Sequence, residues 1–116
     1  MNALRRSSAG FTLVEIMVVI AIIALILAIA IPSMIRNRQI AQSNVCIRNL
    51  TTIENAKQVW GVEKGKSNGD VPASSDFVGP DLYIKVMPEC PAGGTYTFGA
   101  IGANAACTLT SIGHSL

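Results

Sequence analysis

Residues 11–31 read FTLVEIMVVIAIIALILAIAI, an apolar run of 21 residues that contains one charged side chain, Glu15. As a helix it would be about 31 Å long at a rise of about 1.5 Å per residue, enough to cross the hydrocarbon layer of a membrane. A carboxylate inside such a segment is costly in lipid, so Glu15 is expected to have a function. The preceding residues, Met1–Gly10, form a short leader with Arg5 and Arg6 and no acid.

The segment Gly10-Phe11-Thr12-Leu13-Val14-Glu15, joined to this apolar run, resembles the class III signal of type IV pilins and type II secretion pseudopilins. Pro32 lies where that family commonly has a proline. The resemblance implies that a prepilin peptidase cleaves after Gly10 and that Phe11 is then N-methylated. It also implies an assembly role for Glu15, in which the carboxylate pairs with the amine of Phe11 on an adjacent subunit.

Elementary electrostatics supports that role for Glu15. An unpaired carboxylate in an apolar bundle is costly, and the α-amine freed by leader removal is the nearest opposite charge. Residue 15 lies about one helical turn above residue 11, so the pair could form within one subunit before assembly and between subunits afterwards. The alternative is that Glu15 is a tolerated charge near the membrane surface.

The same region also contains the parts of an ordinary secretory signal peptide. Arg5-Arg6 would be its basic region, and Ala28-Ile29-Ala30 would be a small-x-small cleavage site that leaves Ile31 as the first residue. The charge of Glu15 within the apolar core, the length of the run and the position of Pro32 argue against this alternative. A twin-arginine address would have only the arginine pair in its favour.

Charge and motifs limit the remaining classes of function. The sequence has nine Lys and Arg residues against seven Asp and Glu residues. Two of the nine, Arg5 and Arg6, lie in the leader, so a mature chain would carry seven of each and be neutral. A basic run and aromatic–basic interleaving are both absent, which argues against nucleic acid as a standing partner. With no nucleotide loop, catalytic triad or Cys-x-x-Cys pattern, the sequence predicts a non-enzyme without cofactors or a metal ion.

Four segments are expected along the chain. They are a leader at 1–10, a transmembrane or filament-core helix at 11–32, an amphipathic helix at 33–60, and a head domain of loop plus small sheet at 61–116. Pro32 cannot donate a hydrogen bond to the carbonyl of Ala28, and its ring crowds that carbonyl. A kink or a locally melted turn is therefore predicted there.

Beyond the proline the pattern predicts a helix packed on a sheet. Apolar residues recur at spacings of three to four, which indicates one buried helix face; they are Cys46, Ile47, Leu50, Ile53, Ala56 and Trp60. Three β-like runs follow at Leu82–Met87, Thr95–Ala100 and Ala106–Thr110, with glycine-containing connections that favour antiparallel pairing of neighbours. The expected fold class is α+β: a long N-terminal helix whose amphipathic half packs on a three-stranded antiparallel sheet, a pilin-like lollipop.

Three cysteines could stabilise so small a head. Cys90 and Cys107 flank the middle β run, and export from the cytoplasm permits disulfides. A bridge between them is expected and, for a loop of about 15 residues, would contribute about 3 kcal/mol. Two buried free thiols, or a bridge from Cys46, are the alternatives. Cys46 itself is expected to be a small buried apolar residue on the helix face, and His114 a surface residue.

The predicted function is that of a structural subunit of a type IV pilus-like filament, polymerised through its apolar helix. The resemblance implies several partners: like subunits, prepilin peptidase/N-methyltransferase, an inner-membrane assembly platform and, indirectly, an assembly ATPase. Membrane lipid would surround the helix before assembly. The precursor would lie in the inner (cytoplasmic) membrane, and the product would be an extracellular or periplasmic filament.

A pseudopilin of a type II secretion pseudopilus is the alternative function. The resemblance associates major pseudopilins with an acidic, calcium-binding C-terminal loop, and pilins more often with a terminal disulfide. Residues 92–116 contain no Asp or Glu, so such a loop would lack ligands. Together with the expected Cys90–Cys107 bridge, this favours the pilus.

Overall fold

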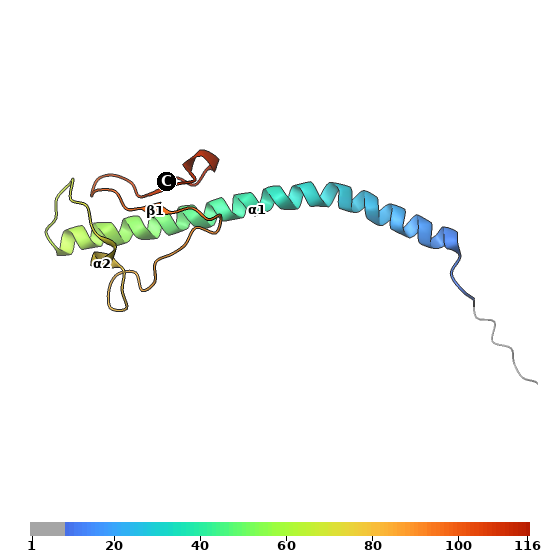
Figure 1. Ribbon diagram of the computed structural model, residues 1–116, viewed down its shortest axis with the longest axis horizontal. Coiled ribbons are helices and arrows are strands. Elements are labelled where there is room, and N and C mark those ends of the chain that lie inside the picture. The colour runs from blue at the N-terminus through green and yellow to red at the C-terminus, as the bar shows by residue number, and fades with distance from the viewer. Residues whose placement is uncertain (1–8) are drawn as a thin grey trace, which may run out of the picture. The chain divides into compact units, whose positions relative to one another are not determined.

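The computed structural model describes residues 9–116 (Figure 1). The predicted leader falls largely outside the described residues, and so do Arg5 and Arg6. The elements in chain order are helix α1 (Leu13–Glu63), helix α2 (Ser74–Phe77), strands β1 (Tyr96–Thr97) and β2 (Ala106–Cys107), and the 3-10 turn η1 (Thr110–Ile112). This order confirms the α+β class. The chain divides into two compact units, which meet at residues 37 and 38.

Helix α1 continues through Pro32. The predicted melted turn is therefore wrong for this structure, because proline removes a single donor and the flanking hydrogen bonds are enough to keep the helix. The predicted kink stays a prediction. At the other end the helix runs three residues beyond the expected position, and Gly65, with a φ of 63°, then turns the chain. The Lys66 N–H reaches back to the Gly61 carbonyl at 2.8 Å, a left-handed C-terminal cap.

The second unit, residues 38–116, has its core along the last part of α1. The predicted face is buried there, with Ile47 half-buried; the buried members are Cys46, Leu50, Ile53, Ala56 and Trp60. Side chains from the following segments cover this face, among them Phe77 and Ile84. The Phe77 ring meets the Phe98 ring edge-on, with centroids 4.8 Å apart. The periodicity of the sequence thus located the buried face correctly.

The sheet has two strands rather than the expected three. Tyr96 pairs with Cys107 and Thr97 with Ala106, antiparallel as predicted. The expected first strand, 82–87, forms only an isolated parallel bridge between Val78 and Ile84. Its backbone is bonded to the turn after α2 instead: the Ile84 N–H donates to the Phe77 carbonyl at 2.9 Å, and the Ile84 carbonyl accepts from the Gly79 N–H at 2.8 Å. That local pairing leaves the segment unavailable to β1.

A buried lysine fastens the β1–β2 connection to α1. The Lys57 side chain is fully buried, and its Nζ lies 2.7 Å from Glu54 Oε2. The same ammonium donates to the Phe98 carbonyl at 2.9 Å and to the Ala103 carbonyl. The Ala105 N–H in turn donates to Glu54 Oε2 at 3.0 Å. These contacts compensate the buried charge, as burial of an ammonium group requires.

Candidate assembly segment and cysteine–histidine cluster

The predicted cleavage site lies just before α1 in a non-helical stretch. Gly10 and Phe11 are both exposed, with 87% of the Phe11 surface accessible. A Cβ added to Gly10 would meet nothing within 4 Å. The Gly10–Phe11 peptide bond is therefore exposed in this structure, and cleavage there stays a prediction.

Glu15 takes part in a reciprocal cap at the start of α1. Its Oε2 accepts hydrogen bonds from the Thr12 N–H at 2.7 Å and from the Thr12 hydroxyl at 3.1 Å, while the Glu15 N–H lies 3.3 Å from the Thr12 Oγ1. This is a capping box, in which Thr is the N-cap and Glu the third helical residue. The carboxylate also lies at the helix N-terminus, where the helix dipole favours negative charge. The Thr-x-x-Glu spacing just before an apolar run is the sequence signal for this cap.

The first part of α1 exposes an almost continuous apolar surface. Every residue from 11 to 35 is exposed, including Leu25 at 69% and Ile29 at 79%. Within the described chain, α1 is the one helix long and apolar enough to cross a membrane, with a mean hydropathy of 3.2 in its most apolar window, of which none is buried. So large an apolar surface indicates an environment of lipid or of other helices.

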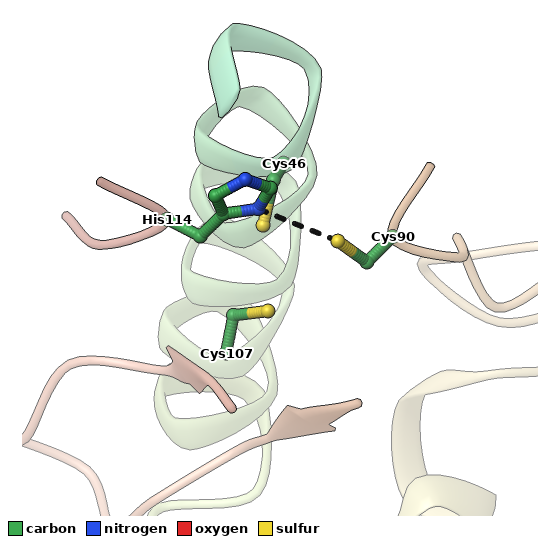
Figure 2. Close-up of side chains that lie close together, drawn as sticks. All are labelled: Cys46, Cys90, Cys107 and His114. Carbon is green, nitrogen blue, oxygen red and sulfur yellow. Dashed lines mark hydrogen bonds between the residues drawn. The ribbon is translucent and has the colours of Figure 1, made fainter. Parts of the chain in front are cut away.

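The second unit brings three cysteines and a histidine together (Figure 2). The ligating atoms of Cys46, Cys90, Cys107 and His114 all lie within 4.8 Å of one another, and all four residues are buried. Cys90 Sγ lies 3.4 Å from His114 Nδ1. All three cysteines are free thiols in this structure, so the Cys90–Cys107 disulfide stays a prediction.

His114 is the clearest departure from the sequence analysis. The surface position expected for it is wrong, since only 2% of its surface is exposed. Turn η1 and the left-handed Gly113, with a φ of 88°, bring the end of the chain back onto α1. The Ser43 hydroxyl then donates to the Gly113 carbonyl at 2.6 Å. No local sequence pattern predicts that the C-terminal residues pack back onto α1.

The cluster shifts the acidity of its thiols in opposite directions. Burial raises the pKa of Cys46 to about 12. Burial also disfavours the Cys90 thiolate, but hydrogen bonds from the N–H groups of Ala92 and Gly94 and from His114 outweigh it and lower the pKa of Cys90 to about 7. The Cys90 thiol is therefore the more acidic of these two.

Two kinds of comparison with known proteins, one with a family model and one with individual relatives, indicate the class of this chain. Residues 5–31 match the model of the prokaryotic N-terminal methylation motif. The competence protein ComGC of Halalkalibacterium halodurans is 31% identical over 85 residues, which cover 73% of this chain and 78% of the relative. No solved structure matches the chain.

Two further relatives match over most of this chain. The type II secretion system core protein G of Klebsiella michiganensis is 26% identical over 95% of this chain and 86% of its own length. The type IV wide pilus major component PilA4 of Thermus thermophilus is 27% identical over 95% of this chain and 76% of its own length.

A capped apolar helix at the N-terminus, a small α+β head and these matches define one class: the chain belongs to the family of type IV pilins and type II secretion pseudopilins. It is a structural subunit of the pilus-like kind. Membership implies processing by a prepilin peptidase and polymerisation with like subunits. It also implies a precursor anchored in the membrane by the apolar helix.

Proposed function

We propose that the chain is cut between Gly10 and Phe11 and that the mature subunit polymerises into a type IV pilus-like filament through residues 11–31. The observation that carries this is the fully exposed apolar surface of that segment. A helix that is stable in lipid is also stable against identical helices, because both surroundings are apolar. Transfer from membrane to filament therefore exchanges one apolar environment for another.

Glu15 supplies the polar contact between subunits in this proposal. Both hydrogen bonds that the Glu15 carboxylate accepts from Thr12 use Oε2, so the cap leaves Oε1 with its acceptor sites for another donor. A carboxylate has about four lone-pair sites and can accept from several donors at once. The amine of Phe11 on a neighbouring subunit, freed by cleavage, is the expected donor, and the pair neutralises both charges within the apolar core.

The partners follow from this cycle. Membrane lipid surrounds residues 11–32 of the precursor in the inner membrane, and prepilin peptidase/N-methyltransferase removes residues 1–10. An assembly platform in that membrane then adds the subunit to the filament, with mechanical work from an assembly ATPase elsewhere. Residues 33–60 continue the helix into the head domain at 61–116. The finished filament lies outside the cell or in the periplasm.

A secretion pseudopilus is the second candidate. It is favoured by the match to type II secretion core protein G, which extends over 95% of this chain. Against it stands the tail, because residues 92–116 contain no Asp or Glu for a calcium loop. Electron microscopy and mass spectrometry of fibres sheared from the cell surface would separate the two: a surface pilus yields fibres that contain this chain, and a pseudopilus confined to the periplasm yields none.

The processing step is tested by intact mass and N-terminal analysis of the exported protein. The proposal predicts Phe11, N-methylated, as the first residue. Gly10→Val should keep the leader attached, whereas the neighbouring Ala9→Val should still be cut, since the site depends on the glycine. A mature chain that begins at Ile31 would instead establish a conventional signal peptide and contradict the proposal.

A further inference from the structure

We propose that Cys46, Cys90, Cys107 and His114 bind one zinc ion, which acts as a structural clamp in the head (Figure 2). The four residues come from separate parts of the second unit: α1, the loop before β1, strand β2, and the tail after η1. One ion would thus join four separate segments of a domain whose sheet has only two strands. Small domains commonly need such a staple in addition to their core.

The geometry needs little adjustment to hold zinc. Zinc–sulfur bonds of about 2.3 Å and zinc–nitrogen bonds of about 2.0–2.1 Å place tetrahedral ligand atoms about 3.5–3.8 Å apart. The four ligand atoms here lie within 4.8 Å of one another, and Cys90 Sγ and His114 Nδ1 are already 3.4 Å apart. The widest pair would therefore close by about 1 Å.

The ligand set also indicates which metal and which role. Three thiolates and one imidazole make up a Cys3His set, which is typical of structural zinc. All four ligand residues are buried, so a fourth position open to water or substrate, which catalytic zinc requires, is not available. His114 also lines a pocket with Gln42 and Ala92, so one side of the cluster adjoins that pocket.

Hydrogen bonds around the cluster hold the Cys90 loop in place. From α1, Gln42 Nε2 donates to the Pro91 carbonyl at 3.3 Å, and Asn49 Nδ2 donates to the Glu89 carbonyl at 3.1 Å. The residues on both sides of Cys90 are therefore tied to the helix that carries Cys46.

His114 and Cys107 are also held in position by neighbouring residues. Ser43 fixes Gly113, the residue before His114. A Cβ added to Gly94 would come within 2.5 Å of Cys107 Sγ, so the absence of a side chain there makes room for that sulfur. Supporting contacts of this kind orient metal ligands in known sites.

Zinc also accounts for more of the cluster than a disulfide does. A Cys90–Cys107 bridge would leave the Cys46 thiol and the His114 ring buried beside it with no share in the bond. A bridge from Cys46 would likewise leave one cysteine and the histidine unused. Zinc uses all four, and because it replaces the disulfide, the expected terminal bridge no longer distinguishes a pilus from a pseudopilus.

Metal content of the full mature chain, purified in detergent without added chelator, tests the proposal. Mass spectrometry under native conditions should show one zinc per chain, and cobalt exchanged into the site should give the intense visible absorption of tetrahedral cobalt–thiolate. Cys107→Ser and His114→Ala should lose most of the metal, and His114→Cys should retain it. Leu50→Ala, which removes buried core beside the cluster but no ligand, should still bind one zinc per chain.

Thiol labelling separates zinc from a disulfide without reference to filament formation. With zinc bound, all three cysteines should resist alkylation until a chelator is added, with no reductant required. A chain in which two cysteines become reactive only after reduction, whatever the chelator, would overturn the proposal. So would a reduced chain that takes up neither zinc nor cobalt, or metal whose amount is unchanged in Cys107→Ser and His114→Ala.

Discussion

Replacing Lys57 with methionine should destabilise the head strongly, because this residue is a buried charge with every partner supplied. Methionine keeps most of the apolar stem but removes the ammonium group. The Phe98 and Ala103 carbonyls lose a donor, and Glu54 loses its ion-pair partner. A buried acceptor left without a donor costs about 1–3 kcal/mol, and breaking a buried ion pair costs about 3–5 kcal/mol. Glu54 keeps the Ala105 N–H and is 19% exposed, so we expect the lower end, a loss of about 3 kcal/mol.

The single tryptophan provides the assay. Trp60 is buried on the same helix, one turn from Lys57, so its fluorescence should report urea unfolding of the head in the full mature chain held in detergent. Lys64→Met is the matched control: Lys64 is exposed, and its change should stay within about 0.5 kcal/mol. If Lys57→Met unfolds at the same urea concentration as Lys64→Met, the Lys57 contacts between α1 and the β1–β2 connection contribute nothing to the stability of the head, and the reasoning is refuted.

The remaining predictions concern acid stability, the Cys107 pocket and the independence of the head. Burial raises the pKa of Glu54, but hydrogen bonds, with that from Lys57 first, outweigh burial and hold this pKa below its ordinary value. The head should therefore lose stability as the pH falls from the ordinary Glu range through the folded-state pKa of Glu54. Urea titrations at several pH values should show this loss, and Lys57→Met should make it smaller. Gly94→Ala should cost about 1–3 kcal/mol in the same titration, since its Cβ would lie 2.5 Å from Cys107 Sγ; an unchanged midpoint would show that the pocket yields freely. Residues 33–116 should sediment as a soluble monomer at micromolar concentration, whereas stable oligomers would mean that the head drives assembly.

Local patterns explain what the sequence could predict. Hydrophobic periodicity placed Cys46, Leu50 and Ile53 on one buried face because helix geometry alone decides which side chains share a face. A long apolar helix over most of residues 11–31 could be predicted for a similar reason, because length and composition are properties of the segment itself. The antiparallel pairing of the two short strands follows from the glycine-containing connection between them.

The features that the sequence could not predict depend on competition for backbone hydrogen bonds or on contacts between residues far apart in the chain. The segment 82–87 has the composition of a strand, but the turn after α2 took its hydrogen bonds. No sequence pattern singles out Lys57, because only the folded β1–β2 connection brings the Phe98 and Ala103 carbonyls to its ammonium group. His114 lies far along the chain from Cys46, so spacing in the sequence gives no sign that the two meet. The proposed metal-ligand set could not be predicted from the sequence for that reason, although the three cysteines and His114 each stand out individually.

The central claim is that residues 11–31 polymerise with a charge pair made by Glu15, and a comparison of three variants tests it most directly. Glu15→Gln can keep the cap with Thr12, since glutamine also serves in a capping box, but it removes the charge. Glu15→Ala removes both, and Thr12→Ala weakens the cap while it keeps the carboxylate. Filament yield is measured by electron microscopy and by quantifying sheared fibres, after processing at Phe11 has been verified for each variant.

The account predicts that Glu15→Gln and Glu15→Ala are inserted and processed but form few filaments, and that Thr12→Ala assembles nearly normally. Insertion should if anything improve, since loss of a charge lowers the cost of the apolar layer. Normal filament yield from Glu15→Gln together with failure of Thr12→Ala would show that Glu15 acts only as a helix cap. Normal yield from Glu15→Ala would remove Glu15 from assembly altogether and contradict the account.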